Sequence, residues 1–222
     1  MGYEFDFSAL AGDAGLLLKG AAITLLLTAI ASTLGIAISI GGAATSRWGM
    51  RWAKLLVAAY VELIRNTPFF VQLLFLFYGL PSIGIKMTAI QVAILAMTIN
   101  LTAYCIEILR AGIEAVPPGQ REAGFALGIG PISVFIYVVL PQAVANVYPA
   151  LVSQIAITML ESAVVSQIAV TDLTHVSEMI QSRSYRAFET SFVVTLIYLV
   201  MCLGLRWMLA RAGRRLFAGR AR

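Results

Sequence analysis

Long, nearly charge-free apolar runs constrain the fold of this chain more than any other feature of its sequence. A helix needs roughly 20 apolar residues to cross about 30 Å of hydrocarbon. The runs predict spans at about residues 16–40, 58–80, 87–109, 149–170 and 190–209. We expect these spans to be helices, because no alternating strand pattern is present and a bilayer offers no partner for unpaired backbone groups.

The composition agrees with an integral membrane protein. Hydrophobic residues make up 60% of the 222 residues and charged residues only 12%, whereas an average soluble domain has about 25% charged residues. We therefore predict an all-α fold, a single helical bundle in the membrane that takes up residues 1–222, with about five transmembrane helices. Cys105 and Cys202 lie within apolar runs and lack metal-ligand spacing, so no metal or cofactor site is predicted in this chain.

Lysine and arginine residues fall mostly on one side of the predicted bundle. With five spans, the side with fewer basic residues receives only Lys19, Lys86, Arg183 and Arg186. The richer side receives Arg47, Arg51, Lys54, Arg110, Arg121 and the C-terminal Arg206, Arg211, Arg214, Arg215, Arg220 and Arg222. By the positive-inside rule, the richer side faces the cytoplasm. The N-terminus is then expected outside and the C-terminus in the cytoplasm.

Four polar residues inside the predicted spans are candidates for a substrate path: Glu161, Asn100, Thr102 and Ser162. Glu161 falls near the middle of the fourth span, where a carboxylate is costly unless it faces a cavity or a partner, so we interpret it as functional. The alternative is a hydrogen-bonded structural glutamate between helices. Asn100 and Thr102 either join helices or line a path, and the pattern slightly favours joining helices.

Three charged residues, Glu62, Arg65 and Glu107, lie nearer the cytoplasmic boundary of the second and third spans. At that depth, pairing and extension of the side chain toward water satisfy a charge at modest cost. Glu62 and Arg65 have i, i+3 spacing, which favours a pair on one helix. We interpret all three residues as members of structural charge pairs.

A polar, glycine-punctuated segment, residues 119–141, separates the third and fourth spans on the cytoplasmic side. Its first part predicts a short helix at about residues 119–130, interrupted by glycines that permit a turn. The residues that define this helix are Glu122, Ala123, Gly124 and Gly128. Taken alone, this pattern fits an ordinary amphipathic surface helix as well as it fits a functional segment.

The sequence contains no motif for ATP hydrolysis. A phosphate-binding loop requires a glycine-rich stretch before a lysine, and Lys19, Lys54 and Lys86 do not follow one. There is no HExxH zinc motif or hydrolase triad, and the single histidine, His175, lies in an external connection. The chain is therefore predicted not to be an enzyme, so any motor must be a separate chain.

Three segments carry the pattern of one transporter family. Residues 62–81 contain Arg-x-Thr-Pro-x-x-Val-Gln, and residues 103–120 lead into the polar segment. That segment then supplies a glutamate, two small residues, a glycine, an aliphatic residue and Leu-Pro at Glu122, Ala123, Gly124, Gly128, Val138, Leu140 and Pro141. Together these segments resemble the permease subunits of ABC importers of the polar amino acid uptake family. Gly124 and Val138 are mild departures from that family's coupling motif.

This resemblance implies a transmembrane permease subunit of an ATP-driven importer in a bacterial inner (plasma) membrane. It implies three kinds of partner: a second permease chain, identical or similar, two cytoplasmic ATPase subunits, and an external substrate-binding protein. ATP and Mg would be bound by the ATPase subunits alone. The helix at residues 119–130 would couple to the ATPase subunits through Glu122, Ala123, Gly124 and Gly128. Contacts with membrane lipid are expected, and none with nucleic acid.

The substrate implied by the resemblance is a polar amino acid. In the fourth span the family often has a Lys-Asp-Thr-Ser-like run, whereas this chain has Leu160, Glu161, Ser162 and Ala163. Because no lysine lies beside Glu161, we hypothesise a cationic amino acid. The alternative class is a proton-coupled secondary transporter or channel subunit in which Glu161 titrates. That alternative has no need of the coupling motif.

Overall fold

The computed structural model describes residues 5–7, 10 and 12–217, and that part of the chain contains helices and turns but no strand. The longer helices are α2 (Ala14–Trp48), α3 (Arg51–Arg65), α4 (Phe69–Ser82), α5 (Ala89–Glu114), α8 (Leu140–Glu161) and α10 (Ala187–Leu216). The shorter elements are α6 (Pro118–Ala126), α7 (Pro131–Val134), the π-helical turn η1 (Phe135–Val139), the 3-10 helix η2 (Ser162–Ile168) and α9 (Leu173–Ser184). Among the described residues, four segments are long and apolar enough to cross a membrane, or five if the bent pair α3–α4 forms one span. The predicted all-α membrane bundle is confirmed.

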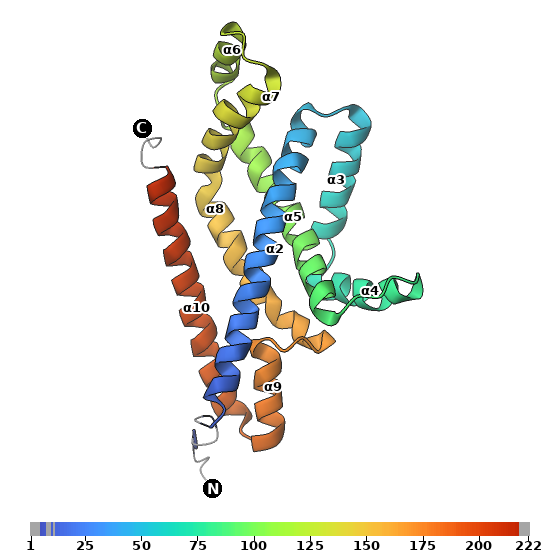
Figure 1. The fold of residues 1–222 in the computed structure, drawn as a ribbon, viewed down its shortest axis with the longest axis vertical. Helices are drawn as coiled ribbons and strands as arrows, with labels where there is room; N and C mark the ends of the chain where they lie inside the picture. The colour runs from blue at the N-terminus through green and yellow to red at the C-terminus, as the bar shows by residue number, and fades with distance from the viewer. Residues whose placement is uncertain (1–4, 8–9, 11, 218–222) are drawn as a thin grey trace.

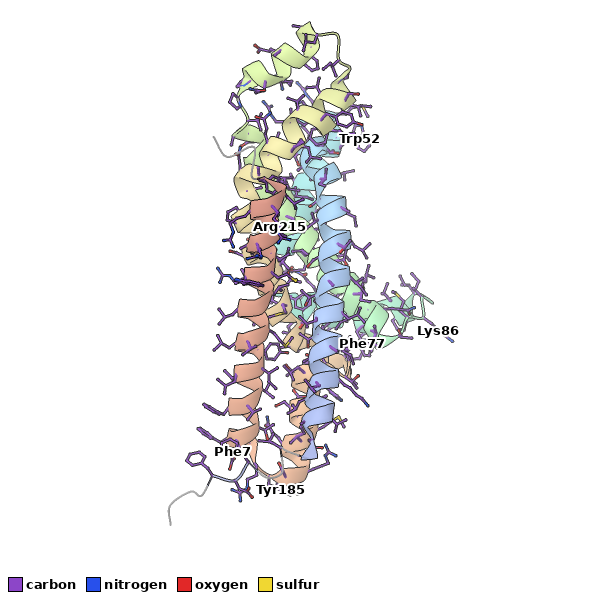
Figure 2. All side chains as sticks on the ribbon, turned by 60° about the vertical axis from the view of Figure 1, so that its left-hand side comes forward. Phe7, Trp52, Phe77, Lys86, Tyr185 and Arg215 are labelled. Carbon is purple, nitrogen blue, oxygen red and sulfur yellow. The ribbon has the colours of Figure 1, made fainter. Side chains whose placement is uncertain are left out.

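The long helices run side by side along the molecule (Figure 1). α2 packs against α5, α5 packs against α8, and α10 lies along α8. α6 lies at one tip, beyond the C-terminal end of α2, and α9 lies at the opposite tip, near the first turns of α2 (Figure 1). We call these tips the α6 end and the α9 end. Trp52 and Arg215 lie toward the α6 end, and Tyr185 lies at the α9 end (Figure 2).

Small residues allow the central helices to approach closely. Gly112 lies on α5 where that helix crosses α8, and a Cβ atom at this position would lie 2.6 Å from Ala143 O. No side chain fits that gap, so glycine permits the close crossing of α5 and α8. The crossing fixes the third and fourth spans against each other just below the α6 end.

The second predicted span is not one straight helix. α3 and α4 meet at a bend of 106°, and α4 projects sideways from the bundle (Figure 1). Pro68 precedes α4 as its N-cap, and a proline has no N–H with which to continue the hydrogen bonds of α3. The continuous helix predicted over residues 58–80 was therefore wrong. The apolar run continues through the break, so hydropathy does not reveal it.

The side chain of Gln72 braces this bend. Its Nε2 donates to Ile64 O at 2.8 Å, to Thr67 O at 3.0 Å and to Thr67 Oγ1 at 2.8 Å. It thereby reaches carbonyls near the end of α3, where the helix itself offers no donor. Oε1 of Gln72 accepts a hydrogen bond from Nδ2 of Asn100 at 3.0 Å, which ties the bend to α5. In the Thr-Pro-x-x-Val-Gln sequence, the proline thus ends α3 and the glutamine stabilises the bend that follows.

The fourth span begins earlier than predicted. α7 starts at Pro131 and continues through η1 into α8, so the candidate span covers Pro131–Ile168 instead of residues 149–170. Pro141 lies in the first turn of α8 and Pro149 lies inside it. Membrane helices tolerate such prolines, because neighbouring helices and local π turns satisfy the freed backbone groups. Glu161 is consequently the last residue of α8, and its predicted position near the middle of the span was wrong.

The remaining boundaries differ from the predictions mainly in length. The spans predicted at residues 16–40 and 190–209 lie within the longer helices α2 and α10, and residues 87–109 correspond to α5. The short helix predicted at about residues 119–130 ends sooner, at Ala126. Long apolar runs therefore locate the spans, while the polar turns beyond them continue as helix at the α6 end. The predicted positions of Arg220 and Arg222 lie outside the described residues.

Candidate functional site

Helix α6 projects beyond the spans at the α6 end (Figure 1). Pro117 precedes it and Pro118 is its first residue. Proline suits this position, because its backbone angle is already helical and the missing N–H has no partner in a first turn. The residues predicted for coupling to an ATPase all lie on α6 or in the turn that ends it: Glu122, Ala123, Gly124 and Gly128.

Gly128 ends α6 in the left-handed conformation, with a φ of +73°. Its N–H donates to Phe125 O at 2.9 Å, and the N–H of Ile129 donates to Gly124 O at 3.1 Å. This pair of bonds is a Schellman motif, which closes a helix and satisfies its last carbonyls. A residue with a side chain would strain this turn. The glycine therefore sets the direction in which the chain leaves α6 and enters α7.

Gly124 is the buried residue of α6 and lies directly against α7. A Cβ atom at Gly124 would lie 2.8 Å from Cγ2 of Val134, closer than non-bonded carbon atoms approach. This contact explains why glycine takes the place of the second alanine in the motif. α6 and the beginning of the fourth span consequently pack as one unit.

The outer side of α6 and its following turn expose apolar side chains. Leu127 is 79% exposed, Phe125 is 46% exposed, and Ile132 beyond the turn is 74% exposed. Glu122 is exposed beside them and forms no hydrogen bond or ion pair within the part of the chain that the structure describes. Exposed apolar side chains grouped at a projecting tip are a feature of surfaces that bind a protein partner or a membrane.

Asn100 and Thr102 are buried in α5 and hold neighbouring elements to it. Asn100 bonds to Gln72 at the bend, as described above. Oγ1 of Thr102 donates to Thr98 O at 2.7 Å and lies 3.3 Å from Gly35 O of α2, within hydrogen-bond range. Oδ1 of Asn100 is buried and has no partner among the described residues. The structure thus shows both residues joining helices, with one acceptor of Asn100 left over.

Glu161 and Ser162 lie at the junction of α8 and η2. Ser162 is fully buried and its Oγ donates to Met159 O at 2.7 Å. Glu161 is half-buried and forms no hydrogen bond or ion pair with other described residues. No hydrogen bond in the described structure links this junction to Asn100 or Thr102. Hydrogen bonds of the described residues therefore do not connect the four predicted path residues with one another.

The predicted charge pairs are partly rearranged. Glu62 does not pair with Arg65; its Oε2 accepts from Nδ2 of Asn66 at 2.9 Å. Arg65 instead turns toward α5, where it lies 3.5 Å from Glu107 and 5.5 Å from the ring centre of Tyr104. The i, i+3 prediction was wrong, because Arg65 ends α3 and the neighbouring helix offers a better partner. Glu107 is also held by Arg110 at 2.9 Å.

A buried carboxylate at the α9 end was not singled out from the sequence. Asp172 is fully buried and caps α9: one oxygen accepts from His175 N at 2.9 Å and the other from Tyr198 OH at 3.3 Å. Burial raises the pKa of this carboxyl to about 6, because the charged form is poorly solvated there. An aspartate directly before a helical segment is a typical cap and was the available signal. Within the described residues, no cluster of His, Cys, Asp and Glu is arranged to hold a metal ion.

Comparisons with known proteins cover nearly the whole chain. Residues 33–218 match the family described as binding-protein-dependent transport system inner membrane component. The chain is 31% identical over 215 residues to the glutamine transport system permease protein GlnP of Escherichia coli (strain K12), which covers 96% of this chain and 98% of the relative. It is 31% identical over 214 residues to the arginine transport system permease protein ArtQ of Bacillus subtilis (strain 168), again covering 96% and 98%.

Solved structures share the fold over the same length. A crystal structure of an amino acid ABC transporter with histidines aligns with a TM-score of 0.86 and 38% identity, covering 96% of this chain and 100% of the other. An inward-facing structure of the MetNI methionine ABC transporter aligns with a TM-score of 0.77, covering 91% and 97%. Its identity of 20% means that this second likeness concerns the fold alone.

Proposed function

Because this chain belongs to the family of binding-protein-dependent transport system inner membrane components, we propose that it is the permease subunit of an ATP-driven importer of polar amino acids. The relatives that cover almost its full length are permease proteins of glutamine and arginine transport systems. The chain itself supplies the membrane path. Its proposed partners are a second permease chain, two ATPase subunits that bind ATP and Mg, and an external substrate-binding protein.

The observation that carries this proposal is the exposed tip of α6. Its motif residues build a rigid projection beyond the spans, with Leu127, Ile132 and the unpaired Glu122 on its surface. A projection of this kind suits a groove on a motor subunit, whose closure would push the tip and rearrange the spans. The rival function, a proton-coupled transporter or channel, gives this tip no role.

The charge distribution supports placing the α6 end in the cytoplasm. Arg47, Arg51 and Lys54 lie where α2 meets α3 at that end, and the basic C-terminal turns of α10 lie there too. At the α9 end, Arg183 lies 3.5 Å from Asp13 and Arg186 lies 3.9 Å from Asp6. Positive charge is thus offset by acids at the α9 end. By the positive-inside rule, the N-terminus is outside and the C-terminus is inside.

Copurification tests the proposed coupling. A tagged chain extracted in mild detergent from its native membrane should bring down an ATPase subunit. Glu122→Lys and Gly128→Asp should each abolish that recovery, because one reverses the charge of the exposed face and the other strains the turn after α6. The matched control is Glu178→Lys, which changes a similarly exposed glutamate at the α9 end. Recovery of no ATPase with the unaltered chain, or full recovery with both α6 variants, would refute the proposal.

We further propose that the transported amino acid is cationic. Glu161 lies within the fourth span, half-buried and unpaired among the described residues, and no lysine adjoins it in sequence. Such a carboxylate favours a cationic group, and the unpartnered Oδ1 of Asn100 offers a further acceptor. Thr102 and Ser162 would shape the path. Unchanged uptake of arginine and histidine by a Glu161→Ala variant would overturn this assignment, whereas a loss of both, with the variant present in the membrane at the unaltered level, would support it.

A further inference from the structure

A groove of about 600 Å³ opens at the α6 end, between the last turns of α2 and the α6–α7–η1 segment. Its walls are almost entirely apolar, with Ile40 and Ala44 on α2 facing Phe135 and Val139 on η1. Trp48 stands at one side of the groove, 41% exposed, with its ring packed edge-on against Phe135 at 5.3 Å. The groove therefore presents a long apolar trough that the described chain does not fill.

A smaller cavity of about 70 Å³ adjoins the groove and carries positive charge. Trp48 and Arg121 line both spaces, and Arg47 lines the smaller one. Neither arginine forms an ion pair among the described residues. The acidic residue in the lining, Glu114, is already bound to Arg110 at 3.0 Å. The small cavity is thus lined by two arginines that have no ion-pair partner among the described residues.

From this arrangement, we propose that the groove binds an anionic phospholipid. The headgroup phosphate lies between Arg47 and Arg121, and an acyl chain lies in the apolar trough. A free phosphate ion would leave the trough uncovered, and an uncharged lipid would leave both arginines unpaired. An anionic phospholipid satisfies both, since basic pockets between membrane helices suit anionic headgroups and Trp favours the membrane interface.

The lipid would join two parts of the molecule that the spans alone do not. Arg121 belongs to α6, whereas Ile40 and Trp48 belong to α2. A lipid in the groove therefore contacts the projecting helix and the first span together. Its effect on coupling rests on the proposed function of α6, but lipid binding does not, and the two can be tested separately.

Bromine quenching of Trp48 fluorescence tests the binding directly. Trp52→Phe and Trp207→Phe leave Trp48 as the single tryptophan of the chain. The full chain is reconstituted into phosphatidylcholine vesicles that contain acyl-brominated phosphatidylglycerol or acyl-brominated phosphatidylcholine. We expect the anionic lipid to bind roughly 30-fold more tightly, and so to quench more strongly at equal low mole fraction, given the usual contribution of two arginines to binding an anionic lipid. No ATPase or transport is involved, so a failure here leaves the proposed function standing.

Two sets of variants separate a built site from general surface attraction. Arg47→Gln with Arg121→Gln should remove the preference for phosphatidylglycerol. Arg211→Gln with Arg215→Gln removes the same charge from the same end of the molecule, on α10 away from the groove, and should keep the preference. An equal loss in both pairs would overturn the proposal, because it would show general electrostatic attraction.

Filling the groove provides an independent check. Ala44→Leu adds bulk to the wall of the trough without changing charge, so it should weaken quenching by both brominated lipids. Unchanged quenching in this variant would overturn the placement of the acyl chain. Equal quenching of the unaltered chain by both lipids would overturn the headgroup assignment. An absence of quenching by either lipid would mean that protein covers the groove, which would refute the proposal.

Discussion

Replacing Gln72 by leucine should destabilise the bend between α3 and α4 more than any ordinary surface glutamine substitution. The side chain makes three contacts to Ile64 and Thr67 and accepts one bond from Asn100. Leucine has a similar size but no polar atoms. The buried Nδ2 of Asn100 would lose the partner that the structure gives it, and the end of α3 would lose a donor to its carbonyls.

The magnitude follows from these bonds. A buried donor left unsatisfied costs about 1–3 kcal/mol, and each further hydrogen bond lost costs about 0.5–1.5 kcal/mol. The additional apolar contact of leucine returns about 1 kcal/mol. The net loss is therefore about 4 kcal/mol, which lowers the midpoint of thermal unfolding of a chain of this size by roughly 8–16 °C.

The assay is thermal unfolding of the purified chain in detergent, followed by circular dichroism. Gln142→Leu is the matched control, because Gln142 lies in a membrane helix but donates a single bond, to Val138 O at 2.8 Å. The double variant Gln72→Leu, Asn100→Leu should recover part of the loss, since removing both partners leaves no orphaned donor. Equal midpoints for Gln72→Leu and Gln142→Leu would show that the side chain does not brace the bend.

Three further predictions concern glycines and the buried carboxylate. Gly128→Val should make α6 more sensitive to proteolysis, because the left-handed turn then costs about 1–2 kcal/mol; Gly130→Val, with open space around it, should not. Gly112→Leu should lower the unfolding midpoint through a clash with α8 worth about 1–3 kcal/mol, whereas Gly119→Leu should leave it unchanged. Asp172 holds its proton to about pH 6 when folded, so stability should fall as the pH rises from about 4 to about 6 and then level off. Asp172→Asn should flatten that dependence in melts between pH 4 and 7, and an identical slope in both proteins would contradict the assignment.

The existence of the spans was predictable because hydropathy is a property of long segments. Their internal geometry was not, since it depends on single side chains that hydropathy averages away. Pro68 lay inside a predicted span without being read as a break. Conversely, Pro149 was read as the start of a span that actually passes through it. A proline either ends or merely perturbs a membrane helix, depending on which neighbours satisfy the freed backbone groups.

In the candidate site too, features set by local conformation were predictable, and features set by contacts between helices were not. The projecting helix was predictable because its glycines are required by local conformation, and Gly128 does adopt a positive φ. The pairing of Glu62 with Arg65 failed, because spacing along one helix cannot show that Glu107 on another helix lies nearer. Gln72 belongs to the Arg-x-Thr-Pro-x-x-Val-Gln pattern that was recognised in the sequence. Its hydrogen bonds across the 106° bend between α3 and α4 are seen only in the three-dimensional structure.

The π turn η1 joins two closely packed parts of the α6 end. On one side of this turn, the Gly124–Val134 contact and the Schellman motif hold α6 and α7 together as one unit. On the other side, α8 is clamped to α5 at the crossing of Gly112. Phe135–Val139 lies between these two packed parts, and its i→i+5 hydrogen bonds make it a π turn within the helix. In the proposed coupling, a displacement of α6 would therefore reach the fourth span through this turn.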